Sequence, residues 1–139
     1  MGLPGGGKTT LAEKLTEEIS QNFPVEWVNA DELRQQVGDW DFTPAGRLRQ
    51  AQRMRAIAQA AESQGIVAIC DFVCPTRELR KEFDADIVVW MDTVQSSEYE
   101  DTNKIFEPPT KEEYDFRITD WTDVDQWSKT LADLVYILE

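Results

Sequence analysis

Histidine is absent from this 139-residue chain, and cysteine occurs only as Cys70 and Cys74. The lack of histidine excludes a Ser-His-Asp triad, a Cys-His dyad and a His-ligated metal site. Two thiols alone also fall short of the four ligands of a structural zinc site. Any chemistry must therefore use carboxylates, Lys, Arg, hydroxyls, thiols, backbone amides or a bound cation.

The spacing of the two cysteines argues against a disulfide. If Cys70 lies on a strand, four residues of rise separate it from Cys74 by about 13 Å, which is too far for a bond. We therefore expect free thiols in a reducing compartment. The sequence also lacks a targeting peptide and any apolar run of about 18 residues, so we expect a cytoplasmic protein with no membrane partner.

Positive charge is scarce, because 14 Lys and Arg stand against 27 Asp and Glu, for a formal net charge of −13. This balance argues against binding along a nucleic-acid backbone, which needs a face rich in Lys and Arg. It does not argue against a nucleotide, since a small phosphate site needs only local positive potential. The length and the 41% hydrophobic share predict one domain, residues 1–139, with a single core.

Apolar, β-rich runs alternate with amphipathic helical patterns along the chain. The predicted strands are residues 25–29, 66–70 and 87–91, with a weaker edge strand at 114–119. The predicted helices follow Thr9 and Pro75, run from Pro44 to about Ser63 behind the N-cap Thr43, and span about 124–138. This alternation predicts an α/β fold of three layers, with a mostly parallel sheet flanked by helices.

The first residues carry a phosphate-binding motif. Residues 2–9 match G-x4-G-K-[ST], the P-loop, and an amphipathic helix begins directly after them, as the motif requires. In this motif backbone N–H groups surround a phosphate, Lys8 supplies charge to the terminal phosphates, and Thr9 offers a hydroxyl to Mg²⁺. We therefore predict a P-loop kinase-like domain that binds ATP through Gly2, Leu3, Pro4, Gly5, Gly6, Gly7, Lys8, Thr9 and Thr10.

A P-loop normally follows a strand in the middle of the sheet, and here Met1 alone precedes Gly2. Without such a strand, the backbone groups of its two neighbours would lack hydrogen-bond partners. We expect the place to be filled by an upstream segment of a longer reading frame, by a partner, or by a rearranged sheet.

Two carboxylates follow predicted strands, at the edge where ligands of open α/β sheets bind. Asp71 follows residues 66–70 in the Walker-B pattern for holding Mg²⁺, so Thr9 and Asp71 form the predicted metal site. Asp31 follows residues 25–29 at the same edge, and for each of the two carboxylates alone a helix N-cap or a turn is the alternative role. The predicted catalytic residues are Lys8, Asp31 and Asp71.

Arginines gather in the middle third of an otherwise acidic chain. Arg34 follows Asp31 by one helical turn, and Arg47 lies in the first turn of the helix that begins at Pro44. Both could hold an anionic substrate with paired hydrogen bonds. Phe42 is a candidate to stack on a base, and a core position explains it equally well.

Two other P-loop classes are excluded. A GTPase needs D-x-x-G and N-K-x-D, but residues 71–74 lack the glycine and residues 103–106 lack the aspartate. The short chain also leaves no room for the sensor and oligomerisation regions of large ATPases.

Most of residues 2–120 resembles the adenylyl-sulfate kinase family, whose members phosphorylate the ribose 3′-hydroxyl of adenosine 5′-phosphosulfate. Besides the P-loop, several segments match in order and at family spacing. Residues 28–34 are similar to L-D-G-D-N-V-R, 42–47 to F-S-x-x-D-R, 72–77 to F-I-S-P-Y-R and 106–109 to Y-E-P-P.

The resemblance implies roles for particular residues. Asp31 would be the base, or the carboxylate that organises the metal, near the 3′-hydroxyl. Arg34 and Arg47 would hold the phosphosulfate, and Phe42 would stack on the adenine. The loop residues that would line the same pocket are Phe72, Val73 and Cys74.

The chain departs from the family between Thr93 and Phe106, where the acidic residues 98–104 stand in place of a basic, mobile lid. The resemblance still implies a kinase that uses ATP and Mg²⁺ on a small anionic acceptor, with adenosine 5′-phosphosulfate as the leading candidate. Open alternatives are a P-loop kinase for a nucleoside, a polynucleotide 5′-end or a sugar acid, and a module that binds ATP without turnover. No long nucleic acid or membrane is expected as a partner, and a homodimer stays open.

Overall fold

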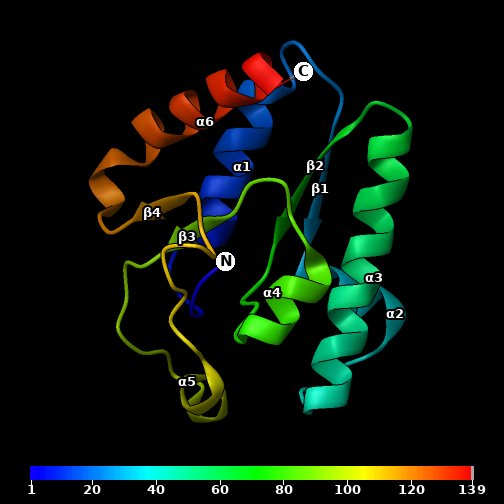
Figure 1. Cartoon of the computed structure of the whole chain (residues 1–139), viewed down its shortest axis with the longest axis vertical. Helices are drawn as coiled ribbons and strands as arrows, with labels where there is room; N and C mark the ends of the chain where they lie inside the picture. The colour runs from blue at the N-terminus through cyan, green and yellow to red at the C-terminus, as the bar shows by residue number, and fades with distance from the viewer. Residues whose placement is uncertain (139) are drawn as a thin grey trace.

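The computed structural model describes residues 1–138 as parallel strands with helices on both sides (Figure 1). Strand β1 (Val25–Asn29) pairs in parallel with β2 (Val67–Asp71) along its whole length. Strand β3 (Val89–Met91) pairs in parallel with β4 (Phe116–Ile118). The predicted strands are therefore confirmed, as is the α/β class, although β2 begins one residue later than expected and β3 and β4 are shorter.

The strands form two separate two-stranded sheets, β1–β2 and β3–β4, and among residues 1–138 no strand joins β2 to β3. Met1 lies between the two sheets: its amino group donates to the Val89 carbonyl at 2.8 Å, and its carbonyl accepts from the Met91 N–H at 2.8 Å. The expectation that a rearranged sheet fills the place ahead of the P-loop is thus wrong for the described chain.

Four of the helices were predicted, namely α1 (Lys8–Ile19), α3 (Pro44–Ser63), α4 (Arg77–Phe83) and α6 (Val124–Leu138). Helix α1 packs against α6, and α3 packs against α4. The strands lie between these two pairs (Figure 1). Thr43 caps α3 as expected, since its side chain accepts a hydrogen bond from the Gly46 N–H.

Three helical elements were not predicted: α2 (Ala30–Val37), α5 (Glu100–Ile105) and the 3₁₀ turn Trp121–Asp123. Helix α2 follows β1 without a loop, because the side chain of Asn29 accepts from the Glu32 N–H and so starts the helix. Both α2 and α5 are short, so neither shows enough turns for a periodic apolar stripe. Within residues 1–138, no helix has the length and apolar character needed to cross a membrane.

Both cysteines are free, as predicted. Burial raises the pKa of the Cys70 thiol to about 12 and that of the Cys74 thiol to about 11. Cys70 lies on β2, and Cys74 is 5% exposed in a core cluster with Ala51 and Leu79.

Candidate active site

The P-loop forms the first part of the site, which we call the phosphate side and define as residues 2–9, Asn29 and Asp71. Gly7 precedes α1 in the left-handed conformation, with φ 92°, a region that glycine adopts without steric cost. Its carbonyl accepts from the Leu11 N–H at 3.0 Å, which starts the helix. A hollow of about 350 Å³ lies against the loop and the first helical turn, lined by Gly5, Gly7, Lys8, Thr9 and Thr10. Backbone N–H groups at a helix N-terminus favour an anion in such a place.

Lys8 is folded back onto the loop, where its Nζ donates to the Leu3 carbonyl at 3.1 Å. Burial lowers the pKa of Lys8, and the negative charges of Asp71 and Asp31 oppose that shift. The ammonium therefore lies within electrostatic range of both predicted catalytic carboxylates.

Thr9 and Asp71 come together as predicted. The Thr9 hydroxyl donates to Asp71 Oδ2 at 3.1 Å, and Asn29 Nδ2 donates to the same oxygen at 2.9 Å. Asp71 is 5% exposed, so these contacts satisfy a buried carboxylate. Asn29 also donates to the Thr9 hydroxyl at 3.3 Å, which closes a triangle of three side chains.

This triangle has the ligand chemistry of a Mg²⁺ site of the kind that is completed by nucleotide phosphates. A hydroxyl and a carboxylate oxygen are hard ligands, and protein Mg²⁺ sites of this kind use one or two carboxylates together with substrate phosphates. Among residues 1–138 no group of three or more His, Cys, Asp or Glu side chains could hold a metal by itself. The arrangement therefore fits Mg²⁺ held jointly by Thr9, Asp71 and a bound nucleotide.

Asp31 lies in the first turn of α2, two residues beyond the end of β1, and its side chain is exposed. Its charge acts on Lys8 of the phosphate side and also on Arg34. The charge of Asp31 is therefore felt both by a residue of the phosphate side and by a residue of the second part of the site.

The second part, which we call the acceptor side, consists of Arg34, residues 38–43, Arg47 and Thr102. Phe42 is 49% exposed, and the guanidinium carbons of Arg34 and Arg47 lie 4.3 and 5.3 Å from its ring centroid. Cation–π contact with two arginines holds the ring while leaving much of it open to a ligand.

The two arginines on Phe42 differ in their remaining contacts. Arg34 is 4% exposed and donates to the carbonyls of Asp39 and Asp41 at 3.1 and 3.2 Å, so it shapes the loop from inside. Arg47 donates to the Phe42 carbonyl at 2.9 Å and to the Thr102 hydroxyl at 3.2 Å. Burial lowers the pKa of both guanidinium groups. Of the two arginines, Arg47 is the more accessible to an anion.

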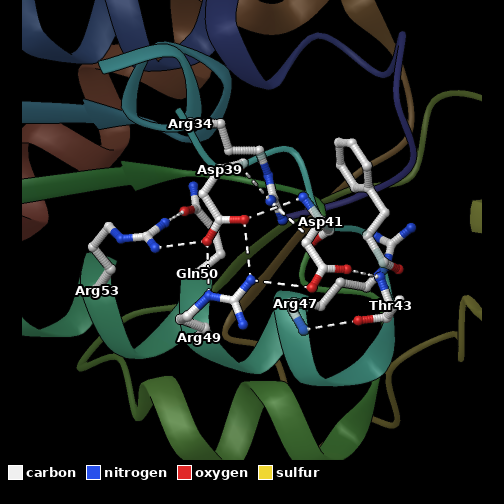
Figure 2. A network of polar contacts seen from close by, with 10 residues as sticks. Arg34, Asp39, Asp41, Thr43, Arg47, Arg49, Gln50 and Arg53 are labelled. Carbon is white, nitrogen blue, oxygen red and sulfur yellow. Dashed lines mark hydrogen bonds and ion pairs between the residues drawn. The ribbon is translucent and has the colours of Figure 1, made fainter. Parts of the chain in front are cut away.

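A network of charged side chains fastens the loop around Phe42 to α3 (Figure 2). Arg49 contacts Asp39 Oδ2 at 2.8 Å and Asp41 Oδ2 at 3.1 Å, and Arg53 contacts Asp39 Oδ2 at 2.8 Å. The hydrogen bonds from Arg49 and Arg53 hold the pKa of Asp39 well below its usual range. Asp39 is therefore the centre of this network, which we call the Asp39 clamp.

The clamp extends to α2 and requires a glycine. Arg53 also donates to Gln50, whose Nε2 donates to the Ala30 carbonyl at 3.0 Å, next to Asp31. A Cβ on Gly46 would lie 2.2 Å from the Asp41 carbonyl oxygen, so the loop can approach α3 this closely only at a glycine.

The predicted pocket residues of the loop after β2 have both core contacts and backbone contacts with the P-loop. Phe72 packs edge-to-face on Phe83, with ring centroids 5.1 Å apart, and Cys74 is buried beside Ala51. The Val73 carbonyl accepts from the Gly2 N–H at 3.3 Å. The Phe72 and Cys74 side chains thus pack in the core, and they also line a cavity of about 730 Å³ together with Lys8 and Asp71. A ligand contact from this loop stays a prediction.

The acidic segment in place of a lid folds as α5. Thr102 of this helix is 7% exposed and receives the hydrogen bond from Arg47. The segment therefore contacts the acceptor side through the Thr102 hydroxyl.

Sequence reasoning missed Asn29, Asp39, Arg49 and Thr102. Asn29 is the last residue of a predicted strand. Asp31 and Asp71 were selected because they follow predicted strands, so the same criterion could have identified Asn29. The contacts of Asp39 with Arg49 and of Thr102 with Arg47 span 10 and 55 residues and have no local pattern.

The sequence profile of the family described as adenylylsulphate kinase matches residues 1–108. A curated relative from Aeropyrum pernix, named "Probable adenylyl-sulfate kinase", is 37% identical over 81 residues, which cover 57% of this chain and 44% of that protein. The adenylyl-sulfate kinase of Deinococcus deserti is 32% identical over 88 residues, which cover 62% of this chain and 49% of that protein. The matched part thus spans less than half of the length of these relatives.

A solved structure shares the fold. The APS kinase of Mycobacterium tuberculosis, determined in complex with AMPPNP and APS, superposes with a TM-score of 0.78 at 19% identity. The superposition covers 98% of this chain and 94% of that one. The likeness confirms the predicted P-loop fold.

Proposed function

Because the chain belongs to the adenylylsulphate kinase family, we propose that it transfers the γ-phosphoryl group of ATP, with Mg²⁺, to a hydroxyl of a small anionic acceptor. The leading acceptor is adenosine 5′-phosphosulfate, phosphorylated on its 3′-hydroxyl. The observation that carries the proposal is the P-loop hollow at the start of α1, beside which the Thr9 hydroxyl donates to Asp71 Oδ2 at 3.1 Å.

The residues of the phosphate side would hold the donor. The loop N–H groups and Lys8 bind the phosphates, while the Thr9 hydroxyl and Asp71 hold the metal ion, in the roles typical of P-loop phosphotransferases. Bound Mg²⁺ would neutralise part of the negative charge of the phosphates. Asn29 keeps Thr9 and Asp71 in register through its hydrogen bonds to both.

Asp31 and the acceptor side would hold and activate the acceptor. Phe42, 49% exposed, would stack its ring on a base, and Arg47, 5.3 Å from that ring, would pair with an anionic tail. Asp31 takes the proton of the attacking hydroxyl, whose oxygen bonds to the γ-phosphorus as the bond to the β-phosphate oxygen breaks and ADP leaves.

A second acceptor class is favoured by one observation: the exposed Phe42 ring suits any nucleotide base. A relative named "Cytidine diphosphoramidate kinase" from Campylobacter jejuni is 28% identical over 79 residues. A cytidine nucleotide with an anionic tail would use the same stacking and the same arginine.

The test is ADP release measured with each member of an acceptor panel. The panel contains adenosine 5′-phosphosulfate, cytidine diphosphoramidate, gluconate, nucleosides and a 5′-hydroxyl oligonucleotide. We expect the phosphosulfate to give the highest kcat/KM. Preference for another member would reject the proposed acceptor and keep the kinase, whereas ATP binding without acceptor-dependent ADP would show a non-catalytic module.

We also propose a cytoplasmic location, which the two free, buried thiols support. A homodimer stays a prediction, to be tested by light scattering of the purified protein.

A further inference from the structure

Arg47 is a partly buried cation whose hydrogen-bond partners are all neutral. Its Nε donates to the Phe42 carbonyl at 2.9 Å and its Nη2 to the Thr102 hydroxyl at 3.2 Å. Within residues 1–138 it forms no ion pair, whereas Arg49, two residues further along α3, is paired with Asp39. A guanidinium group with neutral partners keeps its charge and its remaining N–H groups for an anion.

The hydroxyl of Thr102 uses only half of its hydrogen-bonding capacity. Thr102 is the buried residue of α5, 7% exposed, and its oxygen accepts from Arg47. Thr16 on α1 and Thr130 on α6 each donate their hydroxyl proton to the carbonyl four residues earlier, at 2.7 and 3.0 Å. In the described chain, up to residue 138, the Thr102 hydroxyl donates to no group. A buried donor without an acceptor is costly, so this O–H is available to a ligand.

Contacts on both sides of α5 fix the position of Thr102. Before the helix, Thr93 Oγ1 donates to the Gly6 carbonyl of the P-loop at 2.7 Å. After the helix, the Glu107 N–H donates to the Pro75 carbonyl, in the loop after β2, at 2.7 Å. The Thr102 hydroxyl is thus held between two segments of the candidate site, and its place beside Arg47 does not depend on a single contact.

We propose that Thr102 is an acceptor-binding residue, whose O–H donates to the anionic tail of the acceptor that pairs with Arg47. This inference rests on the proposed function, because it names a group that holds the tail of the acceptor. Thr102 Oγ1 and Arg47 Nη2 lie 3.2 Å apart, so one sulfate or phosphate group can accept a hydrogen bond from each of them. The hydroxyl oxygen can accept from Arg47 while its proton points to the anion, so the two contacts coexist.

The charges near Arg47 explain why a neutral donor is useful there. Burial and the charge of Arg34 lower the pKa of Arg47, and the charge of Asp101 opposes this shift. The carboxylate of Asp101 therefore offsets part of the positive potential that Arg47 presents to an anion. A hydrogen bond from Thr102 strengthens the hold on the tail without another cation, since hydrogen bonds to ionised groups are roughly twice as strong as those between neutral groups.

The experiment measures acceptor binding directly, in the presence of saturating MgADP, so that no turnover is needed. Adenosine 5′-phosphosulfate, which has an anionic tail, and adenosine, which has none, are titrated by calorimetry; cytidine diphosphoramidate and cytidine form a second pair of probes. The proteins are the unmodified chain, Thr102→Val, which removes the hydroxyl at nearly constant shape, and Thr102→Ser, which keeps it. Thr130→Val on the exposed face of α6 and Lys104→Ala on α5 are the controls.

We expect Thr102→Val to weaken binding of the anionic probe about 10-fold, the value of one hydrogen bond to a charged group. Binding of the neutral probe and of ATP should not change, and Thr102→Ser and both controls should stay within about 2-fold of the unmodified protein. Thr102→Ala replaces the valine variant if that variant does not fold. An unchanged affinity for the anionic probe, an equal loss for the neutral probe, or an equal loss in Lys104→Ala would overturn the inference.

A double variant separates direct contact with the acceptor from an effect through Arg47. If the Thr102 O–H reaches the anion itself, Thr102→Val should still weaken binding of the anionic probe about 3-fold or more in the Arg47→Ala protein. An effect that disappears in this background would mean that Thr102 only positions Arg47, and the inference would be wrong.

Steady-state kinetics on the same proteins distinguish failure of this inference from failure of the proposed function. Binding that depends on Thr102 without any acceptor-dependent release of ADP would reject the proposed function and keep the inference. Turnover with an acceptor KM that Thr102→Val leaves unchanged would keep the proposed function and overturn the inference. A protein that binds MgADP but neither anionic probe would overturn both.

Discussion

The P-loop and the loop around Phe42 both present groups to a ligand, but they are held in different ways. On the phosphate side, contiguous backbone from Gly2 to Gly7 makes the cradle, and a single helix start fixes its direction. On the acceptor side, side chains from α2, α3 and α5 hold Phe42 and its loop. The cradle of the phosphate side is therefore made mainly of backbone groups, whereas the loop of the acceptor side depends on charged side chains of other elements.

The largest expected effect is on the cationic side chain of the P-loop, Lys8. Lys8→Ala should weaken ATP binding at least about 100-fold, because only neutral backbone groups then face the phosphates. Titration calorimetry measures this, with Lys14→Ala, further along α1, as the matched control. Unchanged ATP affinity in Lys8→Ala would contradict the role of the P-loop.

Substitutions of Asp31 and Asp71 should affect different steps, namely turnover and Mg²⁺-dependent binding of ATP. Asp31→Asn should leave MgATP affinity unchanged and lower kcat by about 100-fold, the effect of losing a general base. Asp71→Asn should instead raise the Mg²⁺ concentration needed for ATP binding, because it removes the carboxylate beside Thr9. Steady-state kinetics and Mg²⁺ titrations distinguish the variants, and the same defect in both would show that the assigned roles are wrong.

Arg47 tests whether the acceptor side binds an anion. Arg47→Ala should raise the acceptor KM by about 10- to 100-fold, the value of one or two charge-assisted hydrogen bonds, and leave ATP affinity unchanged. Lys129→Ala, an exposed cation on α6, controls for the change in net charge. An equal loss of ATP affinity in Arg47→Ala would mean that the two sides are not separable.

Weakening the Asp39 clamp should also raise the acceptor KM, but by less than the loss of Arg47 does. Asp39→Asn weakens the hold of Arg49 and Arg53 on the loop, so Phe42 is less well positioned and the acceptor KM should rise by about 3- to 10-fold. Because Asp39 would act only through Phe42, kcat at saturating acceptor should stay near that of the unmodified protein. Asp133→Asn on α6 is the matched control, and a fall in kcat without a change in KM would contradict this positioning role.

The clamp also predicts a pH dependence confined to the acceptor side. Hydrogen bonds from Arg49 and Arg53 lower the pKa of Asp39 in the folded protein. The order that they give the loop is thus complete above the ordinary aspartate pKa of about 3.9 and is lost as the pH falls through the lower folded value. Trp40, which lies 6.4 Å from Phe42 between ring centroids, reports this loss by fluorescence, with Trp40→Phe as the background. Identical acid titrations of Asp39→Asn and the unmodified protein would contradict it.

The same contrast explains what could be predicted from the sequence. Thr9 and Asp71 were paired correctly, because a P-loop and a strand followed by aspartate are local patterns that parallel strand ends bring together. Long helices such as α3 were found from Thr43, Pro44 and their periodicity. Sequence reasoning missed the short helices α2 and α5 and the Asp39 clamp. Helix α2 is started by the cap from Asn29, and the other two depend on contacts between residues distant in sequence.

The buried thiols have a practical consequence for following the acidic segment. With pKa values of about 11 and 12, Cys74 and Cys70 carry at neutral pH a thiolate fraction of about one part in ten thousand or less. Alkylating dyes react with thiolates, so both native cysteines are almost silent toward them. A Tyr99→Cys substitution, at a position 56% exposed just before α5, would then take a single fluorophore without removal of any native thiol. That one label would report a change in the surroundings of this segment when ATP or an acceptor is added.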